Sequence, residues 1–206
     1  MAKSNSALYY ELTGRRHVYN IMPIQNIPSV IRYGIVCYDT MSKLPHESVA
    51  MNEVQQRRDS VIIPGGHRLH SYANLYFAYD NPMLYSRKDQ AEKICILAVS
   101  AKVLDIEGCV VSDQNAATGL VRFYPPALGI QSIDFNLVFA RYWTHPEDFC
   151  LQILHKHVKC AEILIPESVP YKFINGAYVY NQQALELLSE YGFTRKIIVE
   201  PKEFYR

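Results

Sequence analysis

The sequence predicts an α+β fold, in which strands and helices share a core without regular strand–helix alternation. Two observations predict it. Strand-like and helix-like segments follow one another irregularly along the 206 residues, and 49% of the residues are hydrophobic, which is enough to form a core. The length favours a single domain over residues 1–206. The glycine patterns GxGxxG and GxxxxGK[ST] of common nucleotide-binding folds do not occur.

Strands are predicted where apolar and aromatic residues run between turn residues. In chain order these segments are residues 15–21, 35–39, 61–72, 74–80, 93–104, 158–166, 175–180 and 196–200. The segment 61–72 begins as a strand and breaks into a loop at Gly65 and Gly66. Residues 112–131 combine small and polar side chains with a Pro-Pro pair, which predicts a long loop of the kind that often carries function.

Helices are predicted from helical spacing of apolar residues and from capping residues. The predicted helices are residues 24–34, 48–58, a short one within 81–88, 145–157 and 181–192. Gly34 is a natural end for the first, and Asn181 and Gly192 cap and close the last. Pro146 is suited to the first turn of the helix over 145–157.

Composition excludes several classes of protein. A charged fraction of 20% with a net charge of +1 argues against disorder and against a uniformly basic nucleic-acid binder, but it permits a local basic groove. The five cysteines show no CxxC spacing, which argues against a disulfide framework and favours a reducing, cytoplasmic location. No window approaches the roughly 18 apolar residues of a membrane span.

The stretch VKCAEILIP, residues 158–166, contains a carboxylate in an apolar strand. Burying an ionised Glu162 is costly unless it has a partner. One interpretation is an ion pair with an arginine beside the sheet; the other is a general base or an acceptor for a sugar hydroxyl. The pair Arg57-Arg58 has two interpretations as well. It is either a solvated helix end that complements the helix dipole, or a guanidinium group that binds a diphosphate or orients a carboxylate.

The histidines do not predict a metal site. His67 and His70 are three residues apart in a loop, and no further ligand cluster accompanies them. His155 and His157 flank Lys156 at a helix end that we expect to be solvated, and His145 is expected to serve in a turn or a cap. We therefore expect no metal.

Four segments resemble, in order, the DarT family of DNA ADP-ribosyltransferases, the toxins of toxin–antitoxin pairs. They are YNIMPIQNIPSVIRYGI, EVQQRRDSVIIPGGHRLHSYANLYFAYDNPML, VRFYPPALG…ARYWTHPED and KCAEILIP. The second is the most specific, because it joins paired arginines to a Gly-Gly, Leu-His, aromatic and Pro-Met-Leu series. The resemblance implies an ADP-ribosyltransferase fold, with a split central β-sheet flanked by helices and NAD bound in the cleft.

The resemblance also implies roles for individual residues. Glu162 matches the family's catalytic glutamate, and Arg58 matches its functional arginine. Tyr76 is expected to form an aromatic wall for nicotinamide. Asn20 stands where the family often has a histidine, so the main chain of Asn20 and Ile21, with Met22 nearby, is expected to contact nicotinamide. The residues expected to contact nucleic acid are Tyr72, Met83, Arg122, Arg141 and Trp143.

The implied reaction uses NAD as a substrate and transfers ADP-ribose to a thymine or guanine base in single-stranded DNA, with release of nicotinamide. The implied partner is a macrodomain antitoxin of the DarG type. Two alternatives remain open from the residues. One is an ADP-ribosyltransferase that acts on RNA or protein, and the other is a non-catalytic nucleic-acid-binding module of the same fold.

Overall fold

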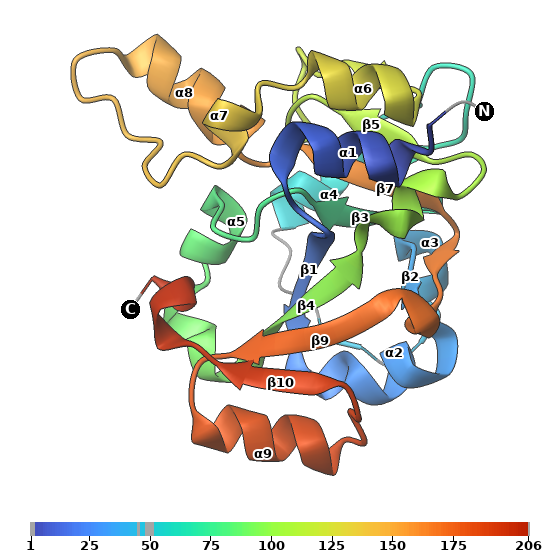
Figure 1. Ribbon diagram of the computed structural model, residues 1–206, viewed down its shortest axis with the longest axis vertical. Coiled ribbons are helices and arrows are strands. Elements are labelled where there is room, and N and C mark those ends of the chain that lie inside the picture. The colour runs from blue at the N-terminus through green and yellow to red at the C-terminus, as the bar shows by residue number, and fades with distance from the viewer. Residues whose placement is uncertain (1–2, 45, 48–51, 206) are drawn as a thin grey trace.

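The computed structural model describes residues 3–44, 46–47 and 52–205. Within them, eight strands form one sheet in the order β10-β9-β4-β1-β3-β7-β5-β6 (Figure 1). Strands β2 and β8 form a separate pair. The strands are β1 (His17–Pro23), β2 (Ile35–Val36), β3 (Tyr72–Tyr76), β4 (Ile94–Ser100), β5 (Val110–Ser112), β6 (Phe123–Tyr124), β7 (Glu162–Pro166), β8 (Ser168–Val169), β9 (Ile174–Val179) and β10 (Lys196–Val199).

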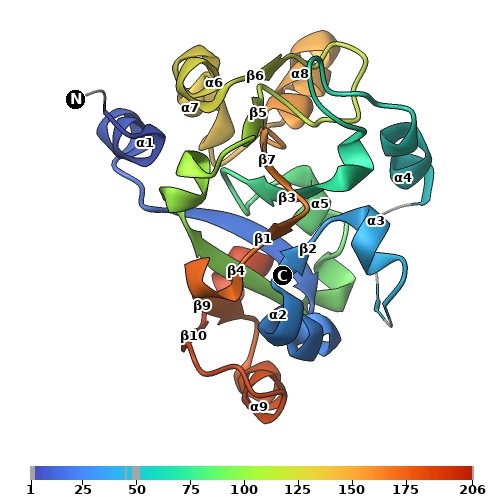
Figure 2. The same ribbon diagram turned by 90° about the vertical axis from the view of Figure 1, so that its right-hand side faces the viewer.

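Helices surround this sheet. They are α1 (Asn5–Thr13), α2 (Ile27–Tyr33), α3 (Tyr38–Met41), α4 (Asn52–Asp59), α5 (Pro82–Tyr85), α6 (Pro126–Ser132), α7 (Phe135–Val138), α8 (Phe149–Val158) and α9 (Gln182–Glu190). Helices α1, α6, α7 and α8 gather at one end of the molecule, and α9 lies at the opposite end beside β10 (Figures 1 and 2). The neighbouring strands are antiparallel except β9 and β10, as an α+β fold requires.

The large sheet is split between β1 and β3. These two strands share a single residue pair, Tyr19 with Tyr76. By contrast, every residue of β1, from His17 to Pro23, pairs with a residue of β4. Every residue of β3 likewise pairs with a residue of β7, from Tyr72 opposite Pro166 to Tyr76 opposite Glu162. Two half-sheets therefore meet at one point and diverge from it. The prediction of a split central sheet is confirmed.

Helix α1 was not predicted from the sequence. Ser4 caps its first turn by accepting a hydrogen bond from the Ala7 N–H, and Gly14 ends it in the left-handed conformation with φ of 67°. Its contact with the core depends on Tyr9, which is fully buried and whose ring lies 5.5 Å from that of Phe77. A single buried residue produces no apolar stripe at helical spacing, so the sequence did not predict this helix.

Two predicted helices have different boundaries in the structure. Helix α4 covers Asn52–Asp59, and residues 48–51 of the prediction lie outside the described residues. Helix α8 begins at Phe149, because the Asp148 side chain accepts the Leu151 N–H as its N-cap. Pro146 therefore precedes the helix, and its placement in the first turn was wrong.

Several predicted strands are shorter than expected. Residues 61–68 form only an isolated bridge between Ile62 and Arg68, because the chain turns at Gly65, where φ is 71°. A short 3-10 helix, Leu69–Ser71, then leads into β3, which begins at Tyr72. The strand over 35–39 ends at Val36, and the one over 158–166 begins at Glu162 because Val158 still belongs to α8. The segment 93–104 was predicted to start as a strand and to continue past it, and it does so: β4 ends at Ser100 and a 3-10 helix, Ala101–Asp105, follows. The predicted loop 112–131 begins with the last residue of β5 and contains β6 and all of α6 except Ser132.

Candidate active site

Glu162 and Arg58 form a buried ion pair beside the split of the sheet. Arg58 Nη1 lies 3.0 Å from Oε1 and 3.1 Å from Oε2 of Glu162. The Ala116 N–H donates a third hydrogen bond to Oε1 at 2.9 Å. Glu162 has no exposed surface and Arg58 has 8%. Burial alone would lower the pKa of Arg58, but the Glu162 carboxylate raises it overall, so the guanidinium stays charged.

The strand register fixes the position of Glu162. It is the first residue of β7, opposite Tyr76 of β3 on one side and Ser112 of β5 on the other. The Glu162 N–H donates to Ser112 Oγ at 3.2 Å. Arg58 reaches it from the last turn of α4. Arg58 and the Ala116 N–H thus hold the carboxylate and Ser112 holds the main chain of Glu162, and such rigidity suits a catalytic group.

Tyr76 stands beside this pair without opening onto the adjoining cavity. It is 8% exposed, and burial raises the pKa of its phenol, with the Glu162 carboxylate adding to the shift. The phenol is therefore neutral across the physiological range. Its neighbour across the other strand pair is Tyr19, so Tyr76 lies where the two half-sheets meet.

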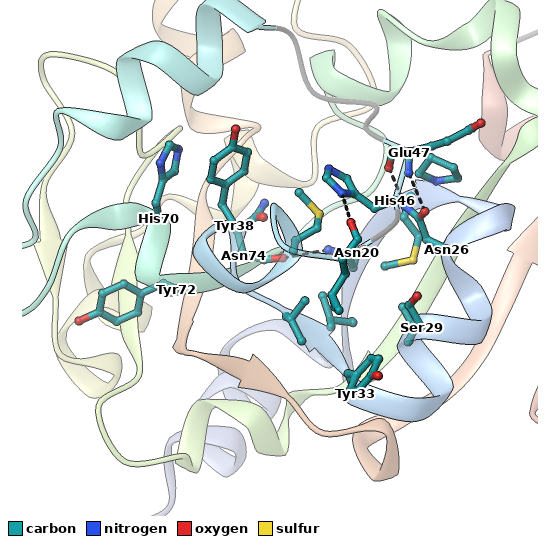
Figure 3. Close-up of a pocket in the computed structure, with 18 of the residues that line it drawn as sticks. Asn20, Asn26, Ser29, Tyr33, Tyr38, His46, Glu47, His70, Tyr72 and Asn74 are labelled. Atoms are coloured by element: carbon teal, nitrogen blue, oxygen red, sulfur yellow. Dashed lines mark hydrogen bonds between the residues drawn. The ribbon is translucent and has the colours of Figure 1, made fainter.

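A cavity of about 150 Å³ opens next to Arg58. The predicted residues Asn20, Ile21, Met22, Arg58 and Tyr72 all line it. Figure 3 shows the polar side chains of β1, α2 and α3 turned toward this space. Sequence reasoning missed many of the polar lining residues: Asn26, Ser29, Tyr33, Tyr38, His46, Glu47, His70 and Asn74. They come from six separate elements and loops, which no local pattern connects.

Asn20 links the two half-sheets beside their meeting point. Its Nδ2 donates to the main-chain oxygen of Asn74 on β3 at 3.0 Å. Its Oδ1 is buried and has no hydrogen-bond partner among the described residues. A buried acceptor without a donor costs roughly 1–3 kcal/mol, so such atoms in a cavity mark a position for a ligand's donor group.

The residues predicted to contact nucleic acid lie in three places. Tyr72 lines the cavity of Arg58 and also a neighbouring cavity behind it. Met83 packs half-buried beside the cluster that contains Tyr76, and Arg122 is exposed on the loop before β6. Arg141 and Trp143 line a separate groove near the C-terminal end, where Trp143 is only 8% exposed. The structure does not bring these five residues into one surface.

The expectation of a solvated His155 was wrong. It is 2% exposed, its Nε2 lies 2.9 Å from the Leu137 carbonyl oxygen, and its Nδ1 lies 2.8 Å from His145 Nε2. Lys159, which no sequence pattern marked as a site residue, is fully buried. Its Nζ donates to Asp80 Oδ2 at 3.1 Å and to the carbonyl oxygens of Val138 and Ala140.

Among the described residues, no group of three or more His, Cys, Asp or Glu side chains is arranged to hold a metal ion. In the same part of the chain, no helix has the length and apolar character needed to cross a bilayer.

The family model described as "ssDNA thymidine ADP-ribosyltransferase, DarT" matches residues 19–206. The chain belongs to the DarT family. It is therefore an NAD⁺-dependent DNA ADP-ribosyltransferase of the toxin–antitoxin type, as the resemblance implied. Of the two bases left open by the sequence, the family description names thymidine.

Curated relatives carry similar names. The chain is 26% identical over 194 residues to a DNA ADP-ribosyl transferase of Thermus sp. strain 2.9, covering 87% of this chain and 90% of the relative. It is 27% identical to a DNA ADP-ribosyl transferase–DNA ADP-ribosyl glycohydrolase fusion protein of Thermosipho africanus. That match covers 90% of this chain and 48% of the fusion, so the chain spans about half of that protein.

Solved structures of DarT proteins share the fold. Thermosipho africanus DarTG in complex with ADP-ribose superposes with a TM-score of 0.78 at 25% identity, over 92% of this chain and 51% of that one. Thermus sp. 2.9 DarT in complex with NAD⁺ gives a TM-score of 0.74 at 23% identity, over 92% and 98%. The predicted ADP-ribosyltransferase fold is confirmed.

Proposed function

We propose that this chain transfers ADP-ribose from NAD⁺ to thymine in single-stranded DNA, with Glu162 and Arg58 as its catalytic residues. The observation that carries the residue assignment is their buried ion pair at the split of the sheet, beside a cavity lined by Asn20. Family membership supports the reaction class, and the pair supports the choice of groups.

The reaction exchanges one bond to the ribose for another. The bond from the ribose carbon to nicotinamide breaks, and nicotinamide leaves with the electron pair. The carbon becomes positively charged, as in glycoside cleavage. A nitrogen of the thymine ring then forms the new bond and loses its proton. A fixed carboxylate at Glu162 stabilises the positive carbon, holds a ribose hydroxyl and accepts that proton.

Arg58 must move to make this carboxylate available, because the guanidinium and the Ala116 N–H together cover it. A guanidinium binds phosphate oxygens as well as it binds a carboxylate, often through two hydrogen bonds. We expect the diphosphate of NAD⁺ to draw Arg58 away from Glu162. Ser112 and Ala116 would keep Glu162 in place after the exchange.

The nicotinamide end would lie against β1. Asn20 Oδ1 offers an acceptor for the carboxamide N–H₂ group, in addition to the main chain of Asn20 and Ile21 with Met22 nearby. Tyr76 would form the aromatic wall beside Glu162. The cavity of about 150 Å³ is smaller than the roughly 300–1,000 Å³ typical of ligand sites, so its walls must separate when NAD⁺ binds.

A macrodomain antitoxin of the DarG type is the partner we propose. Its support is the Thermosipho africanus fusion, whose name joins a DNA ADP-ribosyl transferase to a DNA ADP-ribosyl glycohydrolase. For the acceptor strand we propose contacts with Tyr72, Met83, Arg122, Arg141 and Trp143. The cytoplasmic location and the single domain over residues 1–206 stay predictions.

Radiolabelled NAD⁺ and single-stranded oligonucleotides test the proposal. We expect label on oligonucleotides that contain thymine and none on matched oligonucleotides without it. Glu162→Gln, which keeps the shape but removes the charge, should lose at least about a hundredfold in rate. The matched control Glu190→Gln changes an exposed glutamate and should be unaffected. Transfer to RNA or protein alone would contradict the acceptor, and full activity of Glu162→Gln would contradict the catalytic assignment.

A further inference from the structure

A second groove, of about 940 Å³, lies near the C-terminal end. Helix α5, residues 141–144, helix α8 and the last residues of the chain form its walls, and these elements lie on the same side of the molecule (Figure 1). We call it the C-terminal groove. Its lining includes Arg141, Tyr142, Trp143, Lys156, Lys202 and Tyr205.

The C-terminal groove carries excess positive charge. Arg141, Lys156 and Lys202 are exposed, and none of them pairs with a carboxylate among the described residues. Its two acidic residues are each engaged. Asp80 is bound by the buried Lys159 at 3.1 Å, and Glu203 interacts with the Tyr79 hydroxyl. The Tyr79 hydroxyl leaves the charge of Glu203 in place, so three cations from separate segments face this space together with one carboxylate that has no cationic partner among the described residues. The remaining excess of positive charge favours a polyanion.

Aromatic rings form the walls between these cations. The rings of Tyr85, Trp143 and Tyr205 pack edge to face, with centroids 5.5–5.9 Å apart. Tyr142 is 70% exposed, and the Arg141 guanidinium lies 5.5 Å from its ring centre. The hydroxyl of Tyr205 is buried without a partner among the described residues. Exposed aromatic faces next to cations are the combination that single-stranded nucleic acids bind.

The groove is close to the catalytic pair along two chain segments. Asp80 is four residues beyond Tyr76, and Lys159 is three residues before Glu162. Four extended residues span at most about 14 Å. Stacked nucleotides advance about 3.4 Å each, so a few nucleotides of strand bridge this distance.

We propose that the C-terminal groove binds the single strand that flanks the acceptor thymine. Lys156 and Lys202 contact phosphates, and Tyr142 stacks on a base. This inference rests on the proposed function and adds three contacts to it. It also explains why Arg141 and Trp143 lie away from the catalytic cavity: they belong to the flanking strand's site.

Equilibrium binding without NAD⁺ tests the groove apart from catalysis. The probe is a fluorescent 20-nucleotide single strand with one central thymine, titrated with protein over a series of salt concentrations. For single strands each phosphate contact contributes about 0.7 to the slope of log K against log salt. Lys156→Ala/Lys202→Ala should lower the slope by about 1.4 and weaken binding roughly 10- to 30-fold at 0.1 M salt.

Lys102→Ala/Lys196→Ala is the matched control, because it removes two exposed lysines that lie outside the groove. It should keep the wild-type slope. An unchanged slope in Lys156→Ala/Lys202→Ala, or an equal fall in the control, would overturn the proposal. Tyr142→Ala should weaken binding at least about fivefold, whereas Tyr142→Phe, which keeps the ring, should not.

Transfer assays then separate this proposal from the proposed function. Lys156→Ala/Lys202→Ala should raise KM for the 20-nucleotide strand about tenfold or more and leave transfer to a thymine dinucleotide, which advances only one step of about 3.4 Å, unchanged. A wild-type protein that modifies neither strand would refute the proposed function, while the salt slopes would still decide the groove. An equal loss of transfer activity on the two strands would overturn the proposal for the C-terminal groove, because the short strand does not reach it.

Discussion

Arg58 bonds to both carboxylate oxygens of Glu162, a residue of the strand β7 that has no exposed surface. The two residues are 104 positions apart in sequence and meet through one nitrogen that faces both carboxylate oxygens. The ion-pair and catalytic interpretations of Glu162 are therefore compatible: the partner that stabilises the buried carboxylate is also the group proposed to bind NAD⁺. The same contact serves folding before the substrate arrives and chemistry afterwards.

Removing Arg58 should destabilise the fold. Arg58→Ala leaves the Glu162 carboxylate buried without its charged partner, which costs roughly 3–5 kcal/mol. Arg58→Ala/Glu162→Ala removes both charges and should cost clearly less than the sum of the single changes. Urea unfolding of the four proteins measures the coupling. If the losses in unfolding free energy of the two single variants add up to that of the double variant, the interaction between Arg58 and Glu162 does not stabilise the fold.

Replacing Asn20 should weaken the binding of NAD⁺ more than the binding of the acceptor strand. Asn20→Ala removes the buried Oδ1 proposed to accept from the carboxamide, and one such bond is worth about 0.5–1.5 kcal/mol. We expect KM for NAD⁺ to rise about 2- to 15-fold, with KM for the oligonucleotide unchanged. Asn136→Ala, at an exposed asparagine that does not line this cavity, is the control and should leave both KM values unchanged. A higher oligonucleotide KM with normal NAD⁺ affinity would place Asn20 on the acceptor side instead.

His70 should make stability fall in mild acid. Burial, then the nearby Arg58 charge, lowers the pKa of His70, although Asp59 lies 3.3 Å from its Nδ1. The unfolded chain takes up a proton near pH 6.5, while the folded protein resists until a lower pH. Stability is therefore fully present above about pH 6.5 and falls below it, down to the folded pKa.

His70→Gln should reduce this slope. His17 and His157 also have lowered pKa values, mainly from burial, but both remain in the variant and cancel in the comparison. Thermal unfolding at pH 7.5 and 5.5 gives the difference. If wild type and His70→Gln lose the same stability between these values, the lowered pKa of His70 is refuted.

Lys159 should be essential to the fold. Burial lowers its pKa and raises that of Asp80, and each charge partly offsets the effect on the other. Lys159→Met leaves Asp80 and the carbonyls of Val138 and Ala140 without their donor, so we expect a loss of about 3–5 kcal/mol in urea unfolding. Lys156→Met, an exposed lysine three residues earlier, should change stability by less than about 0.5 kcal/mol. Similar losses in both variants would contradict the role of Lys159.

Periodicity and capping were enough to predict the α+β class and helix α9, whose cap Asn181 accepts the Ala184 N–H as expected. Periodicity and capping failed where a single contact determines whether a helix forms or where it begins. Tyr9 is the one residue of helix α1 that is buried, although Asn5 and Ser6 also bond to Leu104 and Asp105. Helix α8 starts at Phe149 rather than at Pro146, because the Asp148 side chain caps it there. Such choices depend on tertiary partners and local caps that apolar spacing does not reveal.

For the site, the sequence showed that a buried Glu162 needs a partner, but it did not show which residue that partner is. No sequence pattern links Arg58 to Glu162, and only the family resemblance assigned both residues to the same site. The buried Lys159 was missed because a lysine beside a strand ordinarily reads as solvated. Asn20 was found through its place in the family pattern, whereas its unpaired Oδ1 follows only from packing against Asn74.

The single pairing of Tyr19 with Tyr76 has a mechanical consequence. Because one backbone rung and the Asn20 amide join the two half-sheets, they can pivot about this point at the cost of very few hydrogen bonds. Each half stays stiff, since its own ladders run along whole strands. We therefore expect NAD⁺ to enter by rotation of one half-sheet against the other, and the proposed displacement of Arg58 from Glu162 would accompany that rotation.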